Sequence, residues 1–543
     1  MSVIGITFGN TSSSVAVAND GKVDVIANPD GDRAIPSALS YAGDDEYHGF
    51  QAVSQLIRNA PNTIINFRDY IGKPFAEINA DVAHGAAPKQ VGDGVGYEVE
   101  VKGEKQSLPV EEVTKRHLTH LKHAAEDYTG KTVEGAVIAV PTDFSDAQRK
   151  ALASICASAG IKVLQTINEP SAALLAYLST EDNKLSQDKT YVVADFGGIR
   201  SDAAVIVVRG GVLTVLATAH EHGLGGAQLD AALSDFFAKE FTKKTKADAT
   251  ATDRSRAKLL AESIVVKKTL SNVQTSTCSI ESLADGLDFH TTINRLRFEL
   301  AARAPLSNMS AFVEKVVTKA GLDPLDIDEV VLVGGSSHVP KLASNIQFLF
   351  PESTTVVAPA LDPKATDPSE LIARGAALQA SLIESFDDEE IAESLQPIVV
   401  NTQHLRHPIG IKDAAGNFVP ILLSETAYPI KKSIEVTNGD SPAVAIELYE
   451  GKKTIKETVI EPEAKDADAD DDDDSDFSDD EPEVKREIVY EVGTKLAELT
   501  VKDLKPNANV EVVVNIKQDG TLQLSGRELK QGSVAVKGEL KGH

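Results

Sequence analysis

The sequence of 543 residues has no tryptophan and only two cysteines and two methionines. Cys156 and Cys278 lie far apart in the chain, which argues against a disulfide framework and favours a reducing compartment. The chain also lacks an apolar run long enough to span a bilayer, and its start, "MSVIGITFG", has no basic region of the kind that opens a signal peptide. These features together predict a cytoplasmic protein.

Positive charge is scarce as well. The chain has 54 lysines and arginines against 82 aspartates and glutamates, which gives a net charge of −28. A surface of this sign repels the phosphates of nucleic acids and the headgroups of anionic lipids. We therefore expect no membrane binding and no direct binding to nucleic acid, unless a basic partner supplies the contact.

Several common catalytic motifs are missing from the sequence. There is no G-x-x-x-x-G-K-[ST] loop, and "FGGIRS" is followed by an apolar strand pattern rather than by the helix of a dinucleotide site. Two histidine pairs, His220 with His222 and His404 with His407, have no further cysteine or histidine at zinc spacing. We interpret them as exposed loop histidines. No Ser-His-Asp or Cys-His arrangement can be identified from the spacing either.

Two segments of the chain match each other. "GITFGNTSSSVAV" (5–17) and "VADFGGIRSDAAVIV" (193–207) each run from an apolar stretch through Phe-Gly and small residues to a serine and a second apolar stretch. Turns of this kind let backbone N–H groups approach phosphate oxygens, and a neighbouring carboxylate can hold Mg²⁺ through water. The second copy has that carboxylate, Asp195, whereas the first has Thr7. With "LGGAQLD" and "VGGSSHVP", the pair predicts a clamp around a phosphate chain.

The chain divides into regions of different composition. Residues 1–385 alternate Val/Ile-rich runs with helical patterns, which predicts an α/β domain. One helix is expected in "SDAQRKALASICASAG", with Ser145 as its N-cap and Gly160 as its stop. Residues 386–404 form a predicted linker, and residues 405–543 alternate as in a small β domain, with a turn at Asp519-Gly520.

An acidic stretch interrupts the β domain. Residues 461–483, "EPEAKDADADDDDDSDFSDDEPE", have almost no apolar content, so we predict a disordered, solvated insertion. Its uninterrupted aspartates lack the glycine and the spaced ligands of a calcium loop. Ser475 and Ser478 are candidate phosphorylation sites.

A family resemblance rests on blocks that occur in order along the chain. "VIANPDGDRAIPSALSY", "NTIINFRDYIG", "VIAVPTDFSDAQRKAL", "INEPSAALLAY", "KKTLS", "VLVGGSSHVPKL" and "RGAALQA" resemble blocks of the seventy-kilodalton heat-shock chaperones. "IGI", "PIKKS", "ELYEGK" and "NIKQDGTLQLSGRELKQG" resemble that family's peptide-binding β-sandwich. The resemblance runs from about Val3 to Leu540. It implies a two-lobed nucleotide-binding domain with the actin-like ATPase fold, followed by a small β-sandwich.

The departures from that family concern hydrolysis. The resemblance places Thr7 where the family has an Asp that orders Mg²⁺, and Arg68 where it has a lysine near the γ-phosphate. Ile199 and Arg200 replace a glycine and the catalytic-site threonine. The loop residue Glu169 is retained, and so are Asp195 and Asp202. Because hydrolysis depends on positioning a water against a Mg²⁺-bound γ-phosphate, we expect absent or very weak ATPase activity and no intact catalytic set.

Binding of ATP should suffer less than hydrolysis. Amides of the glycine-rich turns are expected to stay available for phosphate, and Arg200 could offset phosphate charge where metal is weakly held. The need for Mg²⁺ is left open. On the adenosine side Lys268 replaces an arginine and Ile264 a glutamate. The expected ATP-binding residues are Gly9, Asn10, Thr11, Ser12, Gly197, Gly198, Gly225, Gly226, Lys267, Lys268, Ser271, Gly334, Gly335 and Ser336.

Two further departures concern coupling between the domains. "QPIVVNTQHL" keeps apolar Ile398, Val399 and Val400 but lacks the family's acidic, leucine-rich linker motif. The sequence ends at His543, soon after the last β-like segment, so we expect no helical lid. An open β-sandwich could still present a groove or a sheet edge to an extended partner segment.

Together these features resemble the atypical fungal Ssz-type subunits of the ribosome-associated complex. The resemblance implies a stable heterodimer with a J-domain protein, zuotin, and attachment to the ribosome mainly through that partner. It also implies stimulation of a separate, active heat-shock chaperone, with nascent polypeptides as further candidate ligands. Two alternatives stay open: an autonomous ATP-hydrolysing folding chaperone, and a small-molecule kinase of the same fold, which would leave the β domain unexplained.

Overall fold

In the computed structural model the chain forms two compact units. One comprises Met1–Lys184, Thr190–Ile206 and Thr214–Ile398, and the other Leu185–Lys189, Val207–Leu213 and Val399–His543. Residues 395–402 of the predicted linker and residues 461–482 of the predicted acidic insertion, including both candidate phosphorylation sites, lie outside the described residues. The structure describes residues 2–19, 22–79, 84–180, 187–384, 386–394, 403–460, 483–530 and 532–540.

The first unit contains two sheets with the same strand order. One has the order β12-β11-β1-β2-β3, from β1 (Ser2–Phe8), β2 (Ser12–Asn19), β3 (Lys22–Val25), β11 (Val133–Val140) and β12 (Lys162–Asn168). The other has the order β19-β18-β13-β14-β15, from β13 (Lys189–Phe196), β14 (Arg200–Arg209), β15 (Val212–His222), β18 (Glu329–Val333) and β19 (Thr355–Val357). In both sheets the strand that comes first along the chain pairs in parallel with the strand that comes fourth, β1 with β11 and β13 with β18. The structure thus confirms the α/β prediction with partly parallel sheets.

Each sheet has its own hydrophobic core, and we call the two parts lobe I and lobe II. The core of lobe I lies within residues 4–163 and includes Ile4, Phe8 and Ile138. The core of lobe II lies within residues 192–358 and includes Phe196, Phe237 and Val330. The Val/Ile-rich runs of both sheets suit strands that are buried on both faces. In β18 every residue is buried.

Helices and smaller sheets complete the two lobes. Ser145 caps α4 as predicted, since its side chain accepts the Gln148 N–H in a capping box, and Gly160 follows the helix with a φ of 71°. The helices are α1 (Gly49–Ser54), α2 (Leu56–Asn59), α3 (Val110–Thr129), α4 (Asp146–Ser158), α5 (Glu169–Leu178), α6 (Gly226–Thr245), α7 (Asp253–Asn272), α8 (Arg295–Ala301), α9 (Arg303–Lys319), α10 (Pro340–Gln347), α11 (Leu371–Ile383) and α12 (Asp388–Ser394). The smaller sheets contain β5 (Ala38–Ala42), β6 (Asp45–His48), β7 (Thr63–Ile65), β8 (Pro88–Val91), β9 (Gly94–Val101), β10 (Glu104–Pro109), β16 (Thr275–Ala284) and β17 (Leu287–Asn294).

Glycines let α11 approach its neighbours closely. A Cβ atom at Gly375 would lie 1.8 Å from the Ala172 carbonyl oxygen on α5. A Cβ atom at Gly5, on β1, would lie 2.1 Å from the Ala377 nitrogen on α11. These contacts fix α5 and α11 against the first sheet, and therefore fix Glu169, which opens α5.

The second unit is a β-sandwich. Its sheets have the orders β21-β20-β23-β24 and β22-β25-β26-β27, and they share a core that includes Leu448 and Leu499 from one sheet and Val512 and Leu524 from the other. The predicted turn at Asp519-Gly520 joins β25 to β26, with the Lys517 N–H donating to the Thr521 oxygen. The strands are β20 (Ile409–Lys412), β21 (Phe418–Leu422), β22 (Ile430–Thr437), β23 (Val444–Ile460), β24 (Glu483–Val501), β25 (Asn509–Ile516), β26 (Leu522–Glu528) and β27 (Val536–Leu540).

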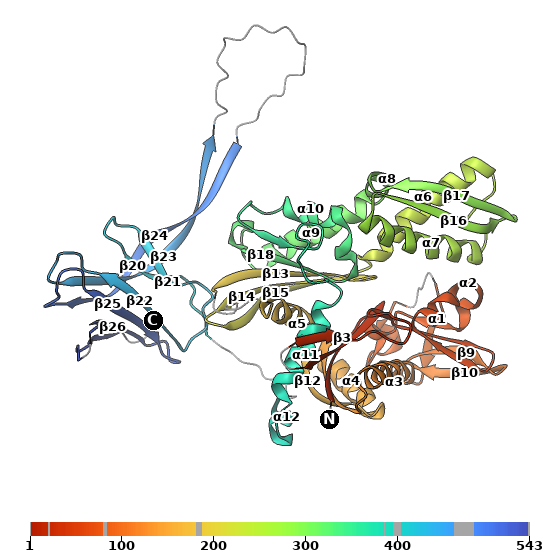
Figure 1. Cartoon of the computed structure of the whole chain (residues 1–543), viewed down its shortest axis with the longest axis horizontal. Coiled ribbons are helices and arrows are strands. Elements are labelled where there is room, and N and C mark those ends of the chain that lie inside the picture. The colour runs from red at the N-terminus through yellow and green to blue at the C-terminus, as the bar shows by residue number, and fades with distance from the viewer. Residues whose placement is uncertain are drawn as a thin grey trace, which may run out of the picture. The chain divides into compact units, whose positions relative to one another are not determined.

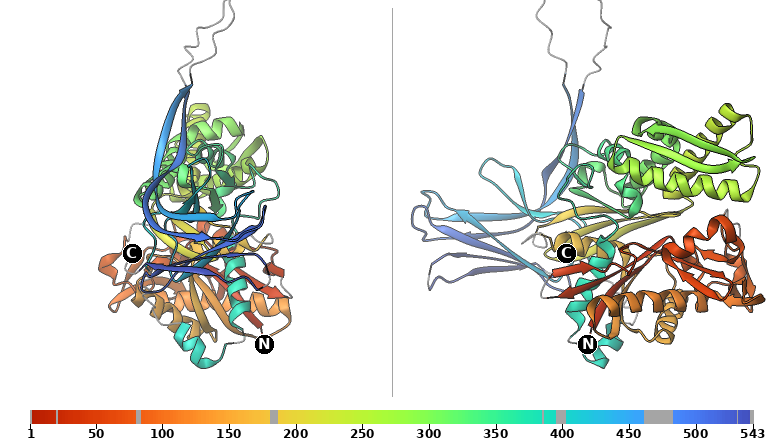
Figure 2. Two further views of the ribbon diagram at one scale, coloured as in Figure 1. Left: turned by 90° about the vertical axis from the view of Figure 1, so that its left-hand side faces the viewer. Right: turned by 45° about the vertical axis from the view of Figure 1, so that its right-hand side comes forward.

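Two of these strands run on past their sheet. β20 pairs only with residues 448–450 of β23, whereas β23 and β24 stay paired from Gly451 to Ile460 as a two-stranded ribbon (Figure 1 and Figure 2). Glu483, the last residue of the predicted acidic insertion, opens β24. The predicted absence of a helical lid stays a prediction.

Candidate functional site

The two matched segments fold into equivalent turns. The Gly9 N–H donates to the Ser12 oxygen at 3.1 Å between β1 and β2, and the Gly197 N–H donates to the Arg200 oxygen at 3.1 Å between β13 and β14. The turns also approach each other, because a Cβ atom at Gly198 would lie 2.2 Å from the Thr11 hydroxyl oxygen. The matched sequences therefore form a pair of facing hairpin turns at corresponding places in the two sheets.

Glycine-rich turns of lobe II gather around the second hairpin. A Cβ atom at Gly226 would lie 2.7 Å from the Ser336 hydroxyl and 3.0 Å from the Lys267 Nζ. The Ser336 hydroxyl donates to the Gly197 oxygen at 2.9 Å, and a Cβ atom at Gly225 would lie 2.7 Å from the Gly198 oxygen. Six of the expected ATP-binding residues, from four segments of the chain, are thus brought together.

Not all of the expected turn amides are available for phosphate. The Gly226 N–H donates to the Gly197 oxygen at 2.9 Å, and the Gly334 N–H donates to the Pro368 oxygen at 2.9 Å. In this arrangement both N–H groups are engaged by oxygens of other segments and are not free for phosphate. The side-chain amide nitrogen of Asn10, by contrast, is buried and has no acceptor among the described residues.

Helix α7 carries the residues expected near adenosine. The Lys267 Nζ lies 2.7 Å from the Asp230 Oδ2 and donates to the Gly226 oxygen at 3.2 Å. The Lys268 Nζ lies 5.5 Å from the centre of the Phe50 ring, and the Ser271 hydroxyl donates to the Lys267 oxygen. Gly335 lies in a short 3-10 helix, Gly335–His338, which follows β18.

Arg68 is held by lobe I and by α5. Its Nε lies 2.8 Å from the Asp69 Oδ1, and its Nη1 lies 3.0 Å from the Glu169 Oε1 and 3.3 Å from the Phe8 oxygen. The side chains of Arg68 and Glu169 are each only 5% exposed. Each of these contacts consumes guanidinium donors, so Arg68 is a fixed structural cation in this arrangement.

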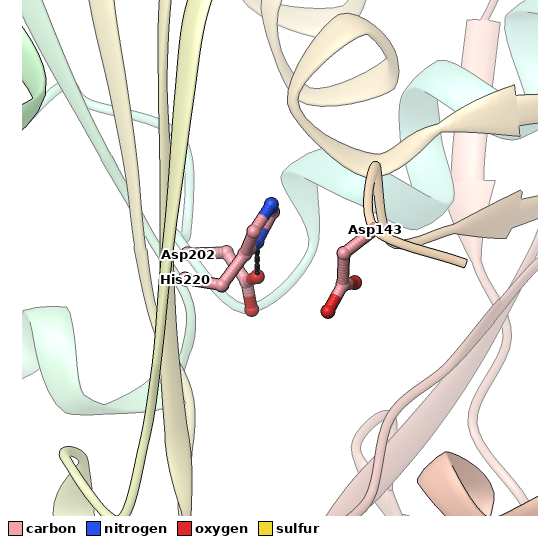
Figure 3. A group of neighbouring side chains, drawn as sticks. All are labelled: Asp143, Asp202 and His220. Atoms are coloured by element: carbon pink, nitrogen blue, oxygen red, sulfur yellow. Dashed lines mark hydrogen bonds and ion pairs between the residues drawn. The ribbon is translucent and has the colours of Figure 1, made fainter. Parts of the chain in front are cut away.

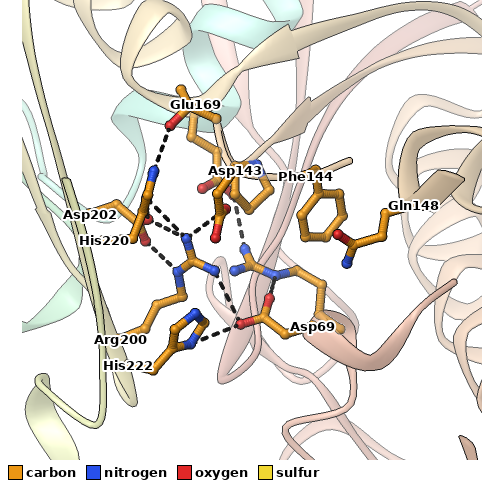
Figure 4. A network of polar contacts seen from close by, with 12 residues as sticks. Asp69, Asp143, Phe144, Gln148, Glu169, Arg200, Asp202, His220 and His222 are labelled. Atoms are coloured by element: carbon orange, nitrogen blue, oxygen red, sulfur yellow. Dashed lines mark hydrogen bonds and ion pairs between the residues drawn. The ribbon is translucent and has the colours of Figure 1, made fainter. Parts of the chain in front are cut away.

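Arg200 is the centre of a wider network (Figure 4). Its Nε lies 2.6 Å from the Asp202 Oδ2, its Nη1 lies 3.2 Å from the Asp69 Oδ2, and its Nη2 lies 2.9 Å from the Asp143 Oδ1. Burial disfavours charge on this side chain, but the surrounding carboxylates, Asp202 first, raise the pKa of Arg200 above its ordinary value. The expected role in offsetting phosphate charge would require these contacts to rearrange.

The carboxyl groups of the site titrate differently because their partners differ. Burial would raise the pKa of Asp69, but Arg68 and Arg200 outweigh it and hold that pKa well below the usual range. Burial raises the pKa of Glu169 to about 7, although Arg68 opposes the shift. Burial, with the nearby carboxylates of Glu169 and Asp202, raises the pKa of Asp195 to about 8. The side chain of Asp195, unlike its backbone on β13, has no hydrogen bond or ion pair with the described residues.

Two departures from the expectations have physical reasons. Glu169 is not in a loop, because it opens α5, where its carboxylate faces the positive end of the helix. His220 is not an exposed loop residue: it lies near the end of β15, it is half-buried, and its Nδ1 lies 2.6 Å from the Asp202 Oδ1. His222 is more exposed, as expected, although its Nδ1 lies 3.6 Å from the Asp69 Oδ2. His404 pairs with Ala427 in an isolated bridge.

Asp69 and Asp143 were missed by the sequence reasoning. Asp69 follows Arg68 directly, and Asp143 follows β11, so both lie inside blocks that were identified for other reasons. The sequence did contain a signal for these aspartates, because a buried arginine that the resembled family lacks needs a carboxylate partner. Thr7, which lies on β1 opposite Ser14, and Ile199, whose oxygen accepts the Gly223 N–H, contribute no charge to the network.

Comparisons with known proteins agree with this architecture. A family model described as Hsp70 protein matches residues 3–461. The chain is 53% identical over 542 residues to the ribosome-associated complex subunit SSZ1 of Saccharomyces cerevisiae, with 99% of each chain covered. The chain belongs to the Hsp70 family. Its resemblance to the Ssz-type branch is confirmed by the same match.

Other members of the Hsp70 family match over similar lengths. A heat shock protein 70 homolog of Schizosaccharomyces pombe is 45% identical over 547 residues, which covers 99% of this chain and 95% of that one. The heat shock 70 kDa protein 14-A of Xenopus laevis is 30% identical over 553 residues, with 98% of each chain covered. Among the described residues of this Hsp70-family chain, none of the helices is both long and apolar enough to cross a membrane.

Proposed function

We propose that this chain is an ATP-binding, non-hydrolysing co-chaperone subunit of the Hsp70 family. It would form a stable heterodimer with a J-domain protein of the zuotin type and reach the cytoplasmic ribosome mainly through that partner. There it would help to stimulate a separate, active chaperone during folding of nascent polypeptides. The identity of 53% with the SSZ1 subunit over 99% of both chains is the observation that carries this proposal.

The residues present fit a bound nucleotide. The buried Asn10 amide has no acceptor among the described residues, and Gly225 and Gly226 leave room where a Cβ atom would collide with the opposite turn or with Ser336. Lys267 and Lys268 would lie toward the nucleotide from α7. The division into a nucleotide-binding domain (1–385), a linker (386–404) and a lidless β-sandwich (405–543) is part of the same proposal.

Fewer residues fit a bound Mg²⁺ than fit the nucleotide. Asp195 is the carboxyl group in this cluster that is not engaged by an arginine, and Gly334 leaves it space, since a Cβ atom there would lie 2.2 Å from the Asp195 Oδ1. Asp195 would therefore face a bound Mg²⁺, while Thr7 offers only a hydroxyl. When bound, Mg²⁺ would neutralise phosphate charge.

Both arginines argue against hydrolysis. Positioning a water for attack requires a donor or acceptor that is free to hold it. Arg68 is engaged by Asp69, Glu169 and the Phe8 oxygen, and Arg200 is engaged by three carboxylates. Glu169, with its pKa raised to about 7, is partly neutral near physiological pH and is already bound to Arg68. These groups hold each other rather than a reacting water.

Single-turnover hydrolysis of labelled ATP, with binding measured in the same samples, tests the enzymatic half of the proposal. The wild type should bind ATP and leave it intact. The recovered rate of turnover should rise from Thr7→Asp, through Arg68→Lys with Arg200→Thr, to the triple variant. Hydrolysis by the wild type at the rate of active chaperones would favour the autonomous chaperone instead.

Co-purification tests the proposed complex with a J-domain protein. A J-domain protein should be recovered in a ratio of about one to one, and the complex should survive removal of nucleotide. The complex, with its basic partner, should bind ribosomes, whereas this acidic chain alone, with a net charge of −28, should not. A partner-free chain whose turnover is stimulated by peptides would contradict the proposal.

A further inference from the structure

Three side chains of the first unit are grouped as if around a metal ion. One ligand atom each from Asp143, Asp202 and His220 lies within 4.8 Å of the others. Figure 3 shows Asp202 and His220 side by side on neighbouring strands, with Asp143 facing them from the loop after β11. Two carboxylates and an imidazole suit divalent ions such as Mn²⁺ and Zn²⁺.

The centre of this group is already occupied by a cation of the protein itself, the Arg200 guanidinium. The Arg200 Nη2 contacts the Asp202 Oδ1, lies 2.9 Å from the Asp143 Oδ1 and lies 3.3 Å from the His220 Nδ1. A single nitrogen therefore contacts a ligand atom of all three residues. The His220 Nδ1 cannot both donate to Asp202 and accept from Arg200, so its 2.6 Å contact with Asp202 is the hydrogen bond and the longer one is a packing contact.

The same guanidinium joins the two lobes. Asp69 and Asp143 belong to lobe I, and Arg200, Asp202 and His220 belong to lobe II. The Arg200 side chain is 6% exposed, so its contacts are shielded from competing water. An arginine is charged at every physiological pH and cannot dissociate, unlike a metal ion. The carboxylates that face it thus have a permanent counter-charge, whatever the concentration of metal ions.

We propose that the Arg200 guanidinium is a covalently attached replacement for a divalent cation, and that Asp143, Asp202 and His220 form a latent metal site that opens when this side chain is removed. The wild-type protein does not bind a metal ion at these residues. Loss of the arginine leaves two carboxylates and an imidazole that face each other across the lobes without a cation. A divalent ion then restores the charge balance and the link between the lobes.

The experiment uses the full chain without nucleotide, so its outcome is independent of the proposed function. Binding of Mn²⁺ to wild type, Arg200→Ala and Arg68→Ala is measured by electron paramagnetic resonance. Arg200→Ala should bind one additional Mn²⁺ at least ten times more tightly than wild type. Asp143→Asn with Asp202→Asn, added to Arg200→Ala, should abolish that gain. Arg200→Lys, which keeps a cation, should show none.

Arg68→Ala is the matched control, because Arg68 is an equally buried arginine that contacts Asp69 but none of the three ligands. An equal gain of Mn²⁺ binding in Arg68→Ala would overturn the proposal, since the effect would then reflect net charge alone. Tight binding by the wild type, abolished by the double aspartate substitution, would also overturn it.

Instability of the variant does not remove the test. If Arg200→Ala is unfolded without metal, the proposal expects Mn²⁺ to restore its circular dichroism and its thermal transition, with no such effect on wild type. Arg200→Gln is then measured as a second variant with a shorter, neutral side chain. Failure of Mn²⁺ to refold or bind to either variant would contradict the latent site.

Discussion

The carboxylate of Asp69 and the guanidinium of Arg200 lie 131 positions apart in the chain, yet they pair at 3.2 Å in the interior of the first unit. Asp69 uses its other oxygen to bind Arg68 at 2.8 Å. A single carboxylate therefore serves both arginines that distinguish this site from the expected one. Since Asp69 belongs to lobe I and Arg200 to lobe II, this residue also couples the two lobes.

Replacement of Asp69 by asparagine should destabilise the first unit strongly. The amide keeps the shape of the side chain but leaves two buried arginines without a shared counter-charge, which typically costs about 3 kcal/mol or more. Unfolding in urea should be followed by circular dichroism, because the chain has no tryptophan to report on folding. Asp235→Asn, at an exposed position of α6, is the control and should change stability by less than about 0.5 kcal/mol. Equal effects of the two substitutions would contradict the bridging role.

The stability of lobe I should fall at mildly acidic pH because of His120. Its ring stacks on that of His48, with centroids 4.6 Å apart and planes 7° apart. Burial, with repulsion from His48 and His123, lowers the pKa of His120 to about 4, although Asp30 opposes the shift. The unfolded chain, with an ordinary pKa near 6.5, therefore binds a proton more readily than the folded chain as pH falls from about 6.5 to 4. Stability is lost over that window.

His120→Gln should remove about 1–2 kcal/mol of this pH dependence, measured as the difference in unfolding free energy between pH 7 and pH 5. His123→Gln is the matched control, because it lies one turn further along α3 and its side chain is exposed. The prediction fails if both variants retain the acid sensitivity of wild type.

Gly375→Ala should destabilise the protein although alanine is the better helix former. In an exposed helix this exchange would gain about 1 kcal/mol. Here the new Cβ atom would lie 1.8 Å from the Ala172 oxygen, so α5 and α11 would have to move apart at a cost of about 3 kcal/mol. Gly335→Ala is the control, because the nearest atom to its Cβ would be the Ser369 hydroxyl at 3.9 Å. Thermal unfolding should separate the two variants, and a stabilised Gly375→Ala would show that the helices can adjust.

How far the sequence predicts this structure depends on the range of the interactions. The two hairpins, the capping of α4 by Ser145 and the turn at Asp519-Gly520 all rest on residues within a few positions of each other, and all are found. The partners of Arg68 and Arg200 could not be assigned in this way. Asp143 and His220 join the network only because β11 and β15 end beside the same hairpin. The sequence shows that arginines stand at these two positions. It does not show which carboxylates pair with them, because that pairing depends on how the two lobes are assembled.

The adenosine side of the site can be tested by separating charge from stability. The Lys267 Nζ lies 2.7 Å from the Asp230 Oδ2, and Asp230 is only 5% exposed. Burial raises the pKa of Asp230, and Lys267 opposes that shift, so Lys267→Ala should cost about 2–3 kcal/mol and also weaken ATP binding at least tenfold. In Lys267→Ala with Asp230→Asn, the unpaired carboxylate is gone, so stability should largely return while ATP binding stays weak. Lys239→Ala, exposed on α6, serves as the control. Full recovery of ATP affinity in the double variant would mean that Lys267 acts only through Asp230 and does not face the nucleotide.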